Sequence, residues 1–220
     1  YPMLLIVNGN LIISGSSTFN WTNRPTANAP AGAFQLNLKG NVTQTGGTIT
    51  TTSAFGSQNY LMFNGTVSQN VQITNMTGSV GLVMFNAAGA VLQAPLTVPY
   101  AFNFISGVLT STATNLLTFS AGTFVAGASN NSFVNGPVRK TGNTAFTFPV
   151  GKPNCGPSGA VNGYAYLAIA TFTGGAVTDQ FTAEYKRGDA MALGAISSPG
   201  LDHISRCDYW TLTRDNGTST

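Results

Sequence analysis

Apolar residues in this chain recur at every second position or in short runs, and Gly, Asn and Ser bound these runs. Such alternation is typical of β-strands that bury one face, whereas a helix repeats its apolar positions every three or four residues. Residues 184–193 are compatible with a helix, but even there residues 181–185 resemble a strand. The pattern therefore predicts an all-β protein.

A strand–turn–strand unit repeats through residues 1–136. It is clearest in LIVNGNLI (5–12), LNLKGNV (36–42) and LMFNGTV (61–67), where Gly lies beside Asn between two apolar runs. The turn glycines recur at intervals of roughly 15–30 residues, and a period of this kind without helices predicts a parallel, β-helix-like β-solenoid. The alternative is an antiparallel sandwich whose hairpins turn at Asn-Gly.

Charge is scarce, because Asp, Glu, Lys and Arg make up 7% of the chain, and residues 1–138 contain no acid. Stacked coils would place equivalent side chains about 4.8 Å apart, so like charges would repel one another. Asn tolerates turn geometry and can stack on Asn of the next coil. The net charge of +3, carried by scattered cations, does not indicate nucleic-acid binding.

The composition changes after Gly136, where prolines and charges become more frequent. Longer runs with alternating apolar positions predict a small antiparallel β-sandwich-like module over residues 137–220, incomplete at its C-terminal end. The solenoid is accordingly expected over residues 1–136. The strands expected in the second module are residues 145–150, 164–172, 179–185 and 207–213.

Motifs in both regions resemble one kind of protein. SFVNGPVRKTG (132–142) and CDYWTL (207–212) resemble a module of large secreted, adhesin-like surface proteins of the Bacteroidota, many of them exported by the type IX system. NGNLIISG (8–15) and LKGNVTQTGGTITTT (38–52) resemble the β-solenoid stretches that precede this module. The resemblance implies a structural or adhesive segment at the cell surface, with no enzyme activity and no catalytic residues.

Candidate chemistry is confined to the last quarter of the chain, where all six acids lie. A structural Ca²⁺ could bind where Asp179 or Asp189 meets Asp202, and no other cofactor or metal site is expected. Cys155 and Cys207 are too far apart in sequence for a metal motif and predict a disulfide, with two free thiols as the alternative.

The first apolar strand has no cap in front of it, and it is too short to insert into a membrane. An uncovered solenoid end exposes unpaired backbone, so we expect either further repeats of the same chain or a second copy to cover it. A second copy would give head-to-tail assembly into a filament. The expected assembly residues are Tyr1, Pro2, Met3, Leu4 and Leu5.

The alternative function is a carbohydrate-binding adhesin module that recognises surface glycans through exposed aromatic and amide side chains. Trp21 lies between Asn20 and Asn23 in a loop-like stretch, so it is the candidate ligand-binding residue. Trp210 is expected in the core, because strand alternation turns either Tyr209 or Trp210 inward.

Overall fold

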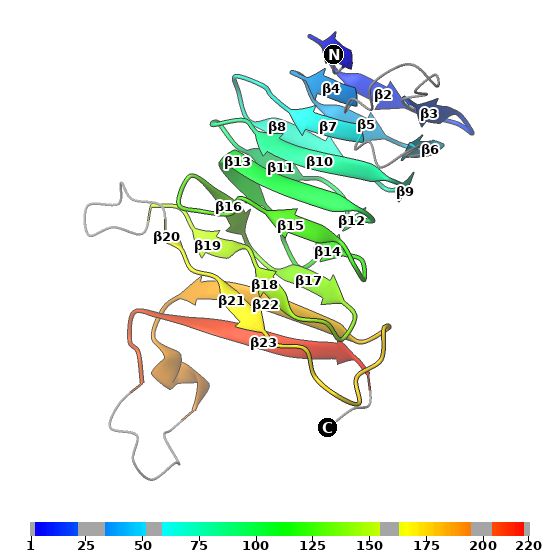
Figure 1. Ribbon diagram of the computed structural model, residues 1–220. Coiled ribbons are helices and arrows are strands. Elements are labelled where there is room, and N and C mark those ends of the chain that lie inside the picture. Colours follow the sequence, from blue (N-terminus) through cyan, green and yellow to red (C-terminus); the bar gives the residue numbers. More distant parts are fainter. Residues whose placement is uncertain (1–2, 22–33, 52–58, 155–162, 195–203, 218–220) are drawn as a thin grey trace.

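The computed structural model describes residues 3–21, 34–51, 59–154, 163–194 and 204–217. Their regular elements are strands, apart from the short 3₁₀ helix η1 (Ala190–Leu193). The chain winds into coils that stack along one axis (Figure 1), and the stacked strands pair in parallel. The all-β class and the parallel β-solenoid are therefore confirmed, and the alternative of Asn-Gly hairpins in this region is wrong.

Three faces surround the interior, and β13 bends from the first face to the second. The first face, called face A, contains β1 (Met3–Val7), β4 (Phe34–Leu38), β7 (Asn59–Phe63), β10 (Val80–Phe85), β13 (Ala101–Thr110) and β15 (Phe124–Ala126). The second, face B, contains β2 (Leu11–Ile13), β5 (Val42–Gln44), β8 (Gln69–Gln72), β11 (Ala90–Leu92), the end of β13, β16 (Ser132–Asn135) and β19 (Val150–Lys152).

The third face is divided into two sheets. The first sheet contains β3 (Thr18–Asn20), β6 (Thr48–Thr51) and β9 (Met76–Gly78). The second contains β12 (Leu96–Val98), β14 (Leu117–Phe119), β17 (Val138–Thr141), β22 (Gln180–Arg187) and β23 (Asp208–Asn216). Three short strands complete the fold: β18 (Phe146–Phe148), β20 (Gly163–Tyr164) and β21 (Leu167–Ile169).

Columns of apolar side chains fill the interior along the stacking axis. On face A, Leu36 pairs with Leu61, Leu61 with Leu82, and Leu82 with Phe102, and all four side chains are fully buried. Burying a side chain of this size contributes about 1.5–3 kcal/mol. Each coil therefore buries its apolar face only because another coil lies above or below it.

Amide side chains connect the turns of successive coils. The backbone N–H of Asn41 donates to Asn10 Oδ1 at 2.8 Å, and that of Asn70 donates to Asn41 Oδ1 at 2.8 Å. Gln93 Nε2 continues the ladder by donating to Asn70 Oδ1 at 3.0 Å. The expected stacking of Asn on Asn is present, and an uncharged polar group makes these bonds without like-charge repulsion.

Buried glutamine side chains also connect the turns of successive coils. Gln44 Oε1 accepts from the backbone N–H groups of Thr74 and Asn75 at 2.9 and 3.0 Å. Gln69 Nε2 donates to the Leu38 carbonyl at 3.0 Å. Both glutamine side chains are fully buried. Buried polar backbone groups need partners, and these glutamines supply them one coil away.

Parallel stacking continues past the boundary expected near residue 136. β17 pairs in parallel with β14, and β19 pairs in parallel with β16. The expected antiparallel strands follow, and β22 pairs with β17 and β23 with β22. These antiparallel strands extend the third face edge to edge, so the last region adjoins the solenoid through shared backbone hydrogen bonds (Figure 1).

Neighbouring coils approach each other closely at Gly9 and Gly40, where the Gly40 N–H donates to the Gly9 carbonyl at 3.2 Å. A Cβ atom on Gly40 would lie 2.4 Å from the Gly9 oxygen, whereas a Cβ on Gly9 has no atom within 4 Å. We expect Gly40→Ala to lower the free energy of unfolding by about 2 kcal/mol or more, and Gly9→Ala by less than about 0.5 kcal/mol. Equal shifts in urea denaturation would contradict the stacking.

Candidate functional site

Aromatic side chains gather where residues 164–166 contact β23, and Tyr166 and Trp210 among them are exposed, whereas Tyr185 is buried. The ring centres of Tyr164 and Tyr166 are 5.8 Å apart, and Trp210 Nε1 donates to the Ala165 carbonyl at 2.8 Å. The Trp210 ring also contacts Tyr185, with 5.2 Å between ring centres. We call Tyr164, Tyr166, Tyr185 and Trp210 the aromatic cluster.

Two rings of the cluster are exposed to solvent, whereas the hydroxyl of the buried Tyr185 donates to Asp208 Oδ2 at 2.7 Å. Tyr166 is 59% exposed and Trp210 is 44% exposed, so the expected core position of Trp210 is wrong. β23 is the outermost strand of its sheet, which leaves the ring of Trp210 only partly covered. Burial, and secondarily the neighbouring Tyr166, raise the pKa of Tyr164 above its usual 10.0, so its hydroxyl stays protonated at neutral pH.

Trp21 does not provide the exposed ring that the sequence suggested. It is buried in the hydrophobic interior, and its ring centre lies 5.2 Å from that of Phe19. The reason is strand alternation, because residues two apart point to the same side of a strand. Phe19 faces inward from β3, and Trp21 continues that inward face.

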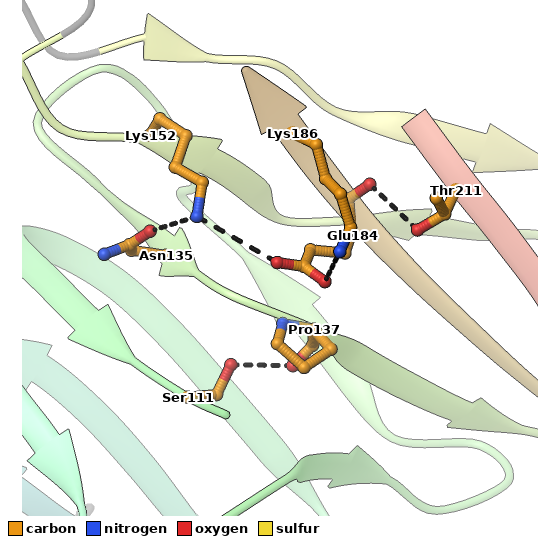
Figure 2. A network of polar contacts seen from close by, with 7 residues as sticks. All are labelled: Ser111, Asn135, Pro137, Lys152, Glu184, Lys186 and Thr211. Atoms are coloured by element: carbon orange, nitrogen blue, oxygen red, sulfur yellow. Dashed lines mark hydrogen bonds and ion pairs between the residues drawn. The ribbon is translucent and has the colours of Figure 1, made fainter. Parts of the chain in front are cut away.

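The single glutamate lies in a charged network at the junction of β19 and β22 (Figure 2). Glu184 Oε2 is 3.1 Å from Lys186 Nζ, and Glu184 Oε1 is 4.0 Å from Lys152 Nζ. Lys152 Nζ also donates to Asn135 Oδ1 at 2.9 Å. This arrangement binds face B to the first antiparallel strand, and the two cations occupy both carboxylate oxygens.

Two of the three aspartates considered for calcium have protein partners. Asp179 Oδ2 pairs with Arg214 at 3.1 Å, and Asp189 Oδ1 accepts from the Met191 backbone N–H at 2.9 Å. Asp202 lies outside the described residues. Within the described ranges, no three His, Cys, Asp or Glu side chains converge on a possible metal position. Cys207 is exposed, and Cys155 lies outside the described residues, so the disulfide stays a prediction.

Lys140 is buried with 3% of its surface exposed, although it is a charged residue. It lies between Phe119 and Phe181 in the strand register, so strand alternation directs it inward. Its Nζ donates to the Thr144 carbonyl and lies 5.9 Å from the centre of the Phe146 ring. Burial lowers the pKa of the Lys140 ammonium below its usual 10.5.

Exposed apolar side chains lie along β1, which pairs only with β4 among the described strands. Leu4, Leu5 and Ile6 of β1 are each at least 44% exposed. Leu5 belongs to the column of Leu36, which is fully buried one coil away. Tyr1 and Pro2 of the expected assembly surface lie outside the described residues.

Comparisons with known proteins give no match, so the evidence on function comes from the fold and the described side chains. No family model matches the chain, and no curated protein or solved structure is significantly similar to it. Among the described residues, no helix has the length and apolar character needed to cross a membrane.

Lys140→Met should stabilise the protein at pH 7 by about 1 kcal/mol, because it removes a buried charge and keeps an unbranched side chain. The pKa of Lys140 lies below 10.5 in the folded protein, whereas in the unfolded chain it has its usual value of 10.5. Between these two pKa values the unfolded chain binds more protons than the folded protein, so the free energy of unfolding of the wild type rises with pH. The advantage of the variant should therefore shrink as the pH approaches 10.5. Urea denaturation of both proteins at several pH values measures this, and a constant difference would contradict it.

Proposed function

We propose that this chain is a non-enzymatic structural and adhesive segment of a secreted, cell-surface protein, and that strand β1 of its solenoid mediates self-assembly. The observation that carries the proposal is β1, which pairs only with β4 among the described strands and whose inward residue Leu5 is 44% exposed. The resemblance to Bacteroidota adhesins exported by the type IX system supports the location, as does the scarcity of charge.

Association at this end has a clear physical driving force. Covering Leu4, Leu5 and Ile6 removes apolar surface from water, and an added strand satisfies the free backbone groups of β1. Contact between the N-terminal end of one copy and a different surface of the next is heterologous, and such contacts build open filaments. Because β1 carries no charge, association should depend little on salt.

Sedimentation velocity over a concentration series tests the proposal. We expect the wild-type chain to form larger species as concentration rises, and Leu5→Asp to shift that onset at least tenfold upward. Ile12→Asp is the matched control, because Ile12 of the neighbouring strand β2 is 70% exposed on the same coil. A wild-type chain that stays monomeric, or equal effects of both variants, would overturn self-assembly through β1.

Carbohydrate binding is the second candidate function, and the aromatic cluster favours it. Tyr and Trp rings combine a flat apolar face with a polar group at the rim. Tyr166 and Trp210 both expose such rings, and Trp210 Nε1 donates to the carbonyl of Ala165, the residue before Tyr166. Trp21 has no part in this proposal, because it is buried.

A glycan array with wild-type protein and Tyr166→Ala tests the second function. We expect a subset of glycans to bind, and Tyr166→Ala to reduce that signal at least tenfold. Phe85→Ala is the control, because Phe85 is an exposed aromatic residue on β10, outside the cluster. An array without binding, or binding that both variants preserve, would exclude the cluster as a glycan site.

A further inference from the structure

The last residues of two paired strands meet where the solenoid joins the antiparallel strands. Asn135 ends β16 and Lys152 ends β19, and these strands pair in parallel on face B. Lys152 Nζ donates to Asn135 Oδ1 at 2.9 Å. Glu184 of β22 lies on the other side of this amine, with its Oε1 atom 4.0 Å from Nζ (Figure 2). An amine, a carboxamide and a carboxylate therefore converge on one point.

These three groups together can form a new amide bond. The neutral amine of a lysine is a nucleophile, and the carboxamide carbon Cγ of Asn135 is bonded to the oxygen that Lys152 contacts. A carboxylate beside the amine can accept and return protons. The distance from Glu184 Oε1 to Nζ is longer than a hydrogen bond, and contacts of this kind are often long before the reacting atoms close up.

We propose that Lys152 and Asn135 form an intramolecular isopeptide bond, with Glu184 as the proton carrier. Glu184 takes a proton from the Lys152 ammonium, and the neutral Nζ attacks Cγ of Asn135. The Nζ–Cγ bond forms and the Cγ–Nδ2 bond breaks. Nζ loses two protons in total, and Glu184 passes them in turn to Nδ2. The amide nitrogen therefore leaves as ammonium, and the reaction needs no oxidant or cofactor.

The surroundings hold the reacting groups in place and leave a path for the product. Val134 and Val150 are fully buried and pair with each other, which fixes the register of the two strand ends. Lys186 Nζ lies 3.1 Å from Glu184 Oε2, so the other carboxylate oxygen faces Lys152. The side chains of Lys152 and Glu184 are 29% and 21% exposed, so the released ammonium can reach solvent.

The bond would fasten a weakly paired position of the stack. β16 and β19 share two paired positions, whereas β4 and β7 share five. A covalent link between residues 135 and 152 closes a loop in the chain, and closing a loop stabilises a fold chiefly by restricting the unfolded state. The link would therefore keep the end of face B attached to the antiparallel strands when the protein is pulled or partly unfolded.

Peptide mapping by mass spectrometry tests the bond. Trypsin cuts after Arg139 and Lys140 but not after Lys152, which precedes Pro153, so an unlinked chain gives separate peptides 40–139 and 141–186. We expect the wild type to give these two peptides joined, with a mass one ammonia below their sum. The intact protein should be lighter than its sequence by the same amount.

Two matched variants identify the nucleophile. Lys152→Arg should abolish the joined peptide, because a guanidinium keeps its proton. Lys186→Arg should retain the joined peptide, although both substitutions keep a cation beside Glu184. Lys152→Arg should also lower the urea midpoint of unfolding, and Lys186→Arg should leave it unchanged.

A further variant tests the carboxylate. Glu184→Gln should slow the appearance of the joined peptide in freshly synthesised protein at least tenfold, and an unchanged rate would overturn the role of Glu184. Separate wild-type peptides of unchanged mass would overturn the bond. Loss of ammonia without joined peptides would instead identify a succinimide at Asn135-Gly136 and would also overturn it. None of these results bears on self-assembly through β1, which sedimentation measures separately.

Discussion

Parallel, in-register stacking is the constraint on which the rest of this structure depends. Equivalent side chains of successive coils lie about 4.8 Å apart. A contact between two such side chains, whether favourable or unfavourable, therefore recurs from coil to coil along the axis. Apolar columns such as Leu36, Leu61 and Leu82 benefit from this repetition, as do the amides of Asn10 and Asn41. Charges do not, which explains why residues 1–138 contain no acid.

Stacking also defines the ends of the molecule, because a coil that lacks a neighbour exposes the groups that every other coil buries. Leu5 is exposed for this reason, whereas its partner Leu36 is fully buried. The other end of the stack differs, since antiparallel strands extend its third face and charged residues alternate there with the apolar Phe181. Lys140 and Arg214 occupy the register positions beyond Phe119.

The all-β class and the solenoid could be predicted, because strand periodicity and the Gly-Asn turns are local signals. The continuation of parallel pairing through β17 and β19 could not, because pairing between distant strands leaves no local pattern. The aromatic cluster shows the same limit, since Tyr166 and Trp210 are brought together by the path of the chain. The burial of Trp21 was accessible in principle, because its two-residue spacing from Phe19 indicates a shared inward face.

Hydrogen–deuterium exchange over a concentration series tests the central claim, that an uncovered coil edge is the association surface. We expect fast exchange of the β1 amides that do not bond to β4 in dilute protein, and protection of the same amides in concentrated protein. The amides of β10, which has a parallel neighbour on each edge, should be protected at both concentrations. Exchange of these amides that does not change with concentration would contradict association through β1.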